Sequence, residues 1–145
     1  MGRAITASLA ALSVAVLLGT AAPAFAEGNL AAKATNLDDL TIDMNKLKFS
    51  TNEYDVETGK YYRLNVVCDD SADDTALMAP EFFRNVWVNQ IAIDELELKS
   101  YGTYSLECDK AGTFVMTFVP IRPGEYDFYI PGYEDKGMKG KFVVK

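Results

Sequence analysis

Apolar and polar residues alternate most regularly in the last two dozen residues of the chain. Between residues 125 and 130 an apolar side chain occupies every second position, and the pattern returns at Phe142 and Val144. A Pro-Gly pair stands before the first stretch and another follows it. Alternation bounded by such turns predicts a β-hairpin over residues 123–144. Because an isolated hairpin is only marginally stable in water, earlier strands must supply an opposing apolar face.

Comparable short stretches are spaced through the chain from residue 38 onward. We expect a short helical turn near Pro80 and, over residues 86–93, an apolar run that is buried, with Trp87 in the core rather than on a binding platform. Seven or eight short strands with Pro and Gly between them and no long helical period predict an all-β, antiparallel β-sandwich. The further strands are expected at residues 40–49, 53–56, 60–68, 104–108 and 113–119.

The first 26 residues have the features of a secretory signal peptide. Arg3 gives a short positive region, residues 5–18 are apolar but too few to span a bilayer, and residues 24–26 read Ala-Phe-Ala. This pattern predicts export to the periplasm of a bacterium with cleavage after Ala26. We expect a flexible mature N-terminus over residues 27–37, one domain over residues 38–145, and no membrane span after cleavage.

The composition narrows the classes of function. Fourteen basic and 21 acidic residues give a formal net charge of −7, which disfavours nucleic acid and anionic membranes as partners and favours basic surfaces or cations. The chain has no histidine, so catalysis by Ser-His-Asp or Cys-His groups is excluded. No spacing of paired carboxylates supports hydrolysis, and we expect a protein that is not an enzyme.

Two cysteines, Cys68 and Cys108, each end an alternating stretch and are therefore expected to point inward. In an oxidising compartment the simplest expectation for such a pair is a disulfide. Free thiols remain the alternative, since sequence separation does not show that the two Cα atoms lie within bridging distance.

The terminal hairpin resembles the copper loop of the cupredoxins, the blue-copper β-sandwich proteins, with its pattern P-G-x-Y-x-F-x-C-x-x-H-x-x-x-G-M-x-G. The frame from Pro123 to Gly140 is present here. Residues 79–83, Ala-Pro-Glu-Phe-Phe, are similar to a segment of one periplasmic cupredoxin-like subfamily. The resemblance covers nearly the whole predicted mature chain and implies a Greek-key, cupredoxin-like sandwich.

The same resemblance assigns four copper-ligand positions. They hold Thr75, Ile130, Tyr133 and Met138, of which only Met138, at the weak axial position, is a ligand type. A type 1 copper site requires two histidines and a cysteine. The resemblance therefore implies the fold without that site, and copper electron transfer ranks third among the functions considered.

Other metal sites are open alternatives. Met78 and Met138 carry soft thioethers that suit Cu(I), although both side chains are also expected as core packing. An acidic set at the same end of the sandwich would suit a hard cation such as Ca²⁺ or Mn²⁺, although solvated loop charges explain it as well. That set comprises Asp69, Asp70, Asp73, Asp74, Glu134 and Asp135.

The leading prediction is a non-enzymatic docking module that most simply has no cofactor. Cupredoxins meet their redox partners through an apolar patch around the copper loop, and the resemblance implies that a periplasmic protein partner docks at the loop around Tyr133. The alternative is that Ile130 and Tyr133 only fill the volume of the lost metal. The second function, from another class, is a metal-handling protein that binds copper or another metal ion through the sulfur or carboxylate groups above.

Overall fold

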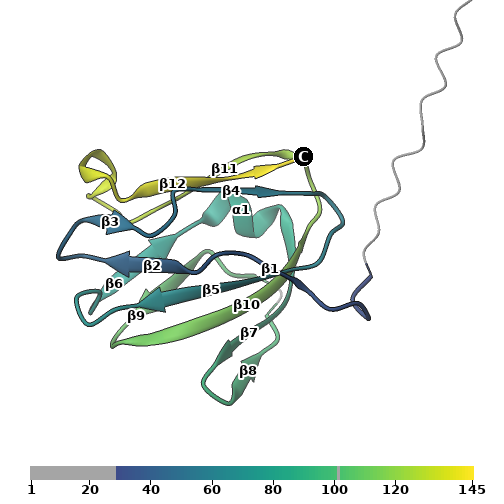
Figure 1. Ribbon diagram of the computed structural model, residues 1–145, viewed down its shortest axis with the longest axis horizontal. Helices are drawn as coiled ribbons and strands as arrows, with labels where there is room; N and C mark the ends of the chain where they lie inside the picture. Colours follow the sequence, from purple (N-terminus) through teal and green to yellow (C-terminus); the bar gives the residue numbers. More distant parts are fainter. Residues whose placement is uncertain (1–28, 101) are drawn as a thin grey trace, which may run out of the picture.

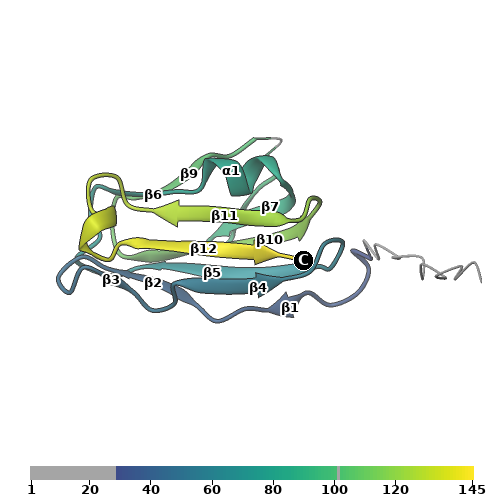
Figure 2. The same cartoon turned by 90° about the horizontal axis from the view of Figure 1, so that it is seen from above.

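Two β-sheets packed face to face form the body of the protein (Figures 1 and 2). The computed structural model describes residues 29–100 and 102–145. The predicted signal peptide therefore lies outside the described residues. Within the described ranges, no helix has the length and apolar character that a membrane span requires.

The first sheet runs in the order β3-β2-β5-β10-β7-β8, and β1 pairs with β5 at its side. Its central strands are the most apolar, and β10 is flanked by β5 and β7 through antiparallel pairing. The bounds are β1 Thr35–Asn36, β2 Leu40–Asp43, β3 Lys48–Phe49, β5 Tyr62–Cys68, β7 Val86–Ile93, β8 Leu96–Leu98 and β10 Gly112–Pro120.

The second sheet runs in the order β4-β12-β11-β6-β9. Its centre is the predicted terminal hairpin, in which β11 and β12 pair antiparallel from Gly124 opposite Val144 to Tyr129 opposite Lys139. The bounds are β4 Glu53–Val56, β6 Thr75–Met78, β9 Ser105–Cys108, β11 Gly124–Tyr129 and β12 Lys139–Val144.

The core lies between the sheets and is rich in aromatic rings. The helical turn predicted near Pro80 is α1, Pro80–Arg84, and it inserts Phe82 between the layers. The Phe82 ring stacks on Phe142 with centroids 3.8 Å apart and meets the edge of Phe118 at 5.2 Å. The predicted disulfide is confirmed: Cys68 of β5 and Cys108 of β9 are bonded with Cα atoms 5.8 Å apart, which ties the two sheets together.

The all-β sandwich is confirmed, but its sheets are mixed rather than purely antiparallel. β2 pairs parallel with β5, and β4 pairs parallel with β12. The reason is that the chain changes sheets between these strands, so neighbours in a sheet are not always neighbours in sequence. Thr35–Asn36, at the end of the segment expected to be flexible, also pairs parallel with β5.

Two expectations about single elements were wrong. The continuous strand over residues 40–49 is a tight hairpin of β2 and β3, because Leu47 adopts a left-handed backbone with φ 49° and reverses the chain without a glycine. Strand β7 is not buried throughout, and Trp87 is 43% exposed. Trp87 lies between two inward-facing valines, so the alternation of the strand turns it to the outer face.

Candidate functional site

Two loops meet at one end of the sandwich, and we call residues 69–74 and 130–138 the loop end. The first loop joins β5 to β6, and the second joins β11 to β12. In Figure 1 the second loop is the yellow segment at the left, at the opposite end of the molecule from the C-terminus. All of the sequence-predicted ligand positions lie in or beside these loops.

Backbone hydrogen bonds make the second loop compact. The Ile130 N–H donates to the Met138 carbonyl at 3.0 Å, and the Met138 N–H donates to the Tyr133 carbonyl at 3.1 Å. A short 3₁₀ helix, η1 Glu134–Lys136, follows Tyr133 and ends at Gly137, whose φ of 103° is one that glycine adopts without strain. The loop therefore holds a fixed shape through its own backbone.

The resemblance predicts copper-ligand positions at Thr75, Ile130, Tyr133 and Met138. Thr75 and Ile130 are buried, and the Thr75 hydroxyl donates to the Asp73 carbonyl at 3.3 Å rather than pointing to a shared centre. Tyr133 is half-buried and lies under the ammonium of Lys136, 4.7 Å from its ring centroid. Among the strong-ligand positions, then, one side chain is a hydrocarbon and two are hydroxyls, a donor set that does not fit type 1 copper.

Sulfur ligands are not brought together. Thr75 and Leu77 of β6 are buried, whereas Ala76 and Met78 alternate to the other face of the strand. Met138 is fully buried in the core. The two thioethers therefore lie on opposite faces of the second sheet, and both cysteines of the chain are consumed by the disulfide.

The six acidic residues are also dispersed. Among residues 29–100 and 102–145, no group of three or more carboxylate, thiol or imidazole side chains is placed to hold a metal ion. Asp69 has a structural partner instead, because it accepts the Ser71 N–H at 2.8 Å. The Ser71 hydroxyl in turn accepts the Met44 N–H at 2.8 Å, which fastens the acidic loop to the end of β2.

What the loop end does form is a shallow hollow of about 500 Å³. Its apolar wall consists of Met44, Leu47, Ile130 and Pro131, and Tyr133 lines it as well. Asp73 and Asp74 stand at its edge and are exposed. The sequence predicted Thr75, Ile130 and Tyr133 here, and all three line the hollow. It missed Met44 and Leu47, because they were assigned to a continuous strand.

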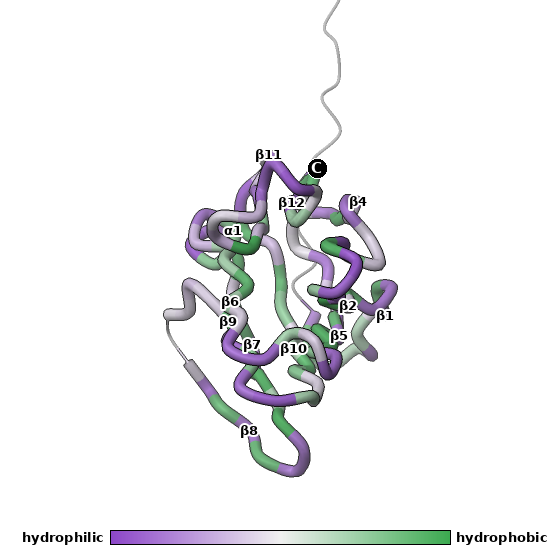
Figure 3. The backbone as a smooth tube through the Cα atoms, turned by 90° about the vertical axis from the view of Figure 1, so that its left-hand side faces the viewer, coloured by the Kyte–Doolittle hydropathy of each residue, from purple (hydrophilic) through white to green (hydrophobic). Residues whose placement is uncertain are grey.

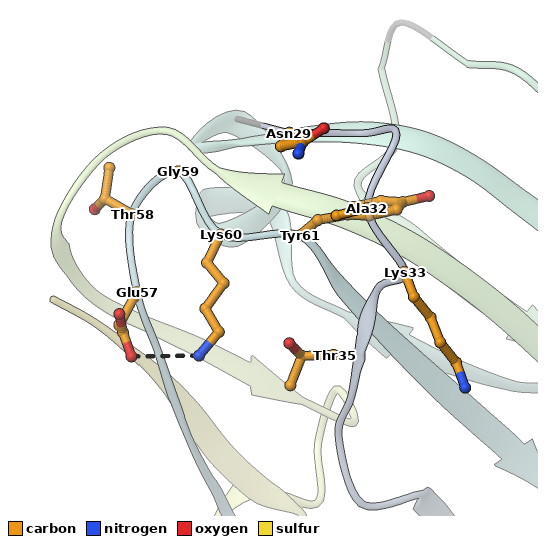
Figure 4. Close-up of a pocket in the computed structure, with 9 residues that line it drawn as sticks. All are labelled: Asn29, Ala32, Lys33, Thr35, Glu57, Thr58, Gly59, Lys60 and Tyr61. Atoms are coloured by element: carbon orange, nitrogen blue, oxygen red, sulfur yellow. Dashed lines mark ion pairs between the residues drawn. The ribbon is translucent and has the colours of Figure 1, made fainter. Parts of the chain in front are cut away.

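A second hollow, of about 410 Å³, lies at the opposite end of the sandwich (Figure 4). It is formed where the segment before β1 crosses the turn between β4 and β5, and Lys60 pairs there with Glu57 at 3.5 Å. Lys33 and Tyr61 contribute further polar groups. Both side chains of the ion pair are exposed to solvent.

The sequence and the structure were compared with those of known proteins. No protein-family model matches the sequence. No curated protein sequence matches it either. Among solved structures, the chain is similar to a multicopper oxidase from Campylobacter jejuni, with 10% identity over 79% of this chain and a TM-score of 0.52.

Two further structures are similar. A second multicopper oxidase has 14% identity over 63% of this chain and 32% of its own, with a TM-score of 0.50. An auracyanin from Roseiflexus castenholzii has 21% identity over 79% of this chain and 98% of its own, with a TM-score of 0.49. The present chain spans only 31% of the length of the Campylobacter oxidase. At these identities the likeness concerns the fold alone. The strand arrangement and the likeness to the two oxidase structures show that this chain has a cupredoxin-like fold.

Proposed function

We propose that this protein is an exported, non-enzymatic binding module whose loop end contacts a protein partner. The observation that carries the proposal is the hollow itself. The loop has a compact, hydrogen-bonded backbone and a buried Met138 at the position that the resemblance predicts as axial. Thr75, Ile130 and Tyr133 at the other predicted ligand positions are not the residue types that type 1 copper requires. The loop end is therefore suited to contact rather than to electron transfer or chemistry.

The surface chemistry of the loop end supports a basic and partly apolar partner. Tyr133 offers an amphipathic ring of the kind that is enriched at protein interfaces, and the hollow beside it has an apolar wall. Exposed Asp73 and Asp74 line the hollow, and exposed Asp135 follows Tyr133 in η1, where the Lys136 ammonium lies over the Tyr133 ring. A lysine or arginine next to an apolar side chain on the partner would fit both features.

The proposal is tested by comparing bait proteins that differ only at the loop end. Mature wild-type protein, Tyr133→Arg and Trp87→Arg are immobilised, and proteins from the periplasm of the source bacterium are quantified on each. Trp87 is an exposed aromatic on β7 outside the loop end, so it is the matched control. A partner retained by wild type and by Trp87→Arg should be lost from Tyr133→Arg, since the change puts a cation on an acidic surface.

The purified partner should then bind with an affinity that falls as salt increases, because exposed charges are screened. Identical protein sets on all three baits would refute docking at the loop end. A partner that binds Tyr133→Arg as tightly as wild type in a titration would refute it as well.

A further inference from the structure

A hairpin made of β7 and β8 leaves large apolar side chains uncovered. Strand register places Ile93 opposite Leu96, and Ile91 opposite Leu98, so all four share one face of the hairpin. Ile91 is buried, whereas Ile93, Leu96 and Leu98 are 44%, 77% and 55% exposed. We call these three residues the hairpin face. Two exposed leucines on the same face of an edge strand are unusual, because an apolar edge strand can pair with a strand of another chain.

The hairpin face belongs to the side of the first sheet that faces the second sheet. It lies past the last strand of the second sheet, so no described strand of that sheet covers it. The path of the first sheet has six strands and ends at β8, whereas the second has five and ends at β9. Figure 3 shows β8 projecting beyond the rest of the sandwich. Within the described ranges, β9 pairs only with β6, so its other edge has no strand beside it. Among the described strands, the second sheet therefore has none opposite the hairpin.

A groove of about 330 Å³ lies beside the tip of this hairpin, at the turn that joins β9 to β10. It runs between the tip of the hairpin and the end of β9, and it is lined by Ile93, Phe114 and the Cys68–Cys108 disulfide. Glu107 and Asp109 line its other side. Ile93 therefore belongs both to the hairpin face and to a groove that reaches the end of β9, so an added strand that pairs with β9 would lie beside both.

The charged residues around the groove indicate which kind of segment could bind there. The acidic residues around the groove and the hairpin outnumber the basic ones, and Lys99 is already paired with Glu97 at 3.3 Å. A second copy of this chain would bring the same acidic groups against them, so self-pairing is disfavoured. The acidic residues are Asp94, Glu95, Glu97, Glu107 and Asp109, and the basic ones are Lys99 and Lys110.

We propose that the free edge of β9 accepts an extended segment of another protein, whose apolar side chains alternate with lysine or arginine. Its backbone would pair with Ser105–Cys108, its apolar side chains would lie on the hairpin face, and its basic side chains would face Glu107 and Asp109. Strand addition of this kind obtains affinity from backbone hydrogen bonds and specificity from alternate side chains. This surface is separate from the loop end, so the proposal goes beyond the function proposed above.

A random twelve-residue peptide library is the probe. The library is selected on mature wild-type protein, and enriched peptides are titrated against wild type, Leu96→Glu and Tyr133→Arg. Enriched sequences should alternate apolar and basic residues. Leu96→Glu should weaken binding about tenfold or more, because one large apolar contact is lost. Tyr133→Arg should leave it unchanged, which separates this surface from the loop end. Hydrogen exchange of the β9 amides should slow when peptide is bound.

Several outcomes would overturn the proposal. These are failure to enrich any peptide, enriched peptides that bind Leu96→Glu as tightly as wild type, and β9 amides that exchange equally fast with and without peptide. A wild-type dimer that Leu96→Glu dissociates, measured by sedimentation, would assign the surface to a second copy instead. Urea unfolding of Leu96→Glu provides the control for folding, since a residue 77% exposed should tolerate the change.

Discussion

Gly140 packs so closely under an aromatic ring that no larger residue fits there. A Cβ atom at this position would lie 2.2 Å from Cζ of Phe128 and 2.6 Å from the carbonyl oxygen of Asn52. The Asn52 oxygen is fixed, because it accepts the Lys141 N–H at 2.9 Å. The Phe128 ring is fully buried and lies 5.3 Å from the ring centroids of both Phe49 and Phe142. Neither neighbour can move away cheaply.

We therefore expect Gly140→Ala to lower the free energy of unfolding by about 3 kcal/mol, the upper part of the usual range for overpacking a core. Urea unfolding followed by circular dichroism measures the change. With a slope of about 2 kcal/mol/M, the midpoint should fall by about 1.5 M. Gly112→Ala is the matched control, because its added Cβ meets nothing within 4 Å. A midpoint for Gly140→Ala equal to that of the control would refute the packing of the terminal hairpin described here.

Two further predictions concern the disulfide and a buried phenol. The Cys68–Cys108 bond joins residues 40 positions apart. From the loss of chain entropy that such a bond imposes on the unfolded state, we expect its removal in a double alanine variant to reduce the free energy of unfolding by about 4 kcal/mol. Urea unfolding measures this change, and a reduction below about 1 kcal/mol would contradict the prediction. Burial raises the pKa of Tyr54 from 10.0 to about 12. The folded state therefore favours the neutral phenol, and the free energy of unfolding is unaffected by this group below pH 10. We expect it to fall by about 2 kcal/mol as pH rises from 10 to 12, because the phenol ionises first in the unfolded state. Tyr54→Phe should show a shallower alkaline loss than wild type in parallel unfolding curves, and equal slopes would be the contrary result.

Much of the terminal hairpin and its loop could be predicted because local sequence determines them. Alternation over residues 125–130 and the Pro-Gly pairs specify strand, turn and inward face within a few residues. The disulfide was predictable for the same reason, since alternation pointed both cysteines inward. Thr75, Ile130 and Tyr133 could be placed beside one another only through the cupredoxin resemblance, because they come from distant strands.

The sequence-based predictions were wrong where the structure depends on pairing between segments that are distant in the sequence. Nothing in the residues of β2 or β4 specifies a parallel neighbour, so the mixed character of both sheets could not be read locally. The exposure of Leu96 arises because the second sheet ends one strand before the first. Trp87 is exposed because it faces outward on β7, which depends on where the inward-facing residues of that strand fall. The turn at Leu47 has no glycine or proline, so its sequence resembles a strand.

The central claim is that a cupredoxin-like loop end here serves contact and binds no type 1 copper. The most direct test is a titration of the mature wild-type protein with Cu(II), followed by visible and electron paramagnetic resonance spectra, and with Cu(I) against a competing chelator. The triple variant Thr75→His, Ile130→Cys, Tyr133→His, which supplies the missing ligand types beside Met138, is the comparison. We predict no stoichiometric binding of either ion by wild type, and a thiolate-to-copper absorption band in the triple variant alone. Tight one-to-one binding of either ion by the wild-type protein would contradict the account.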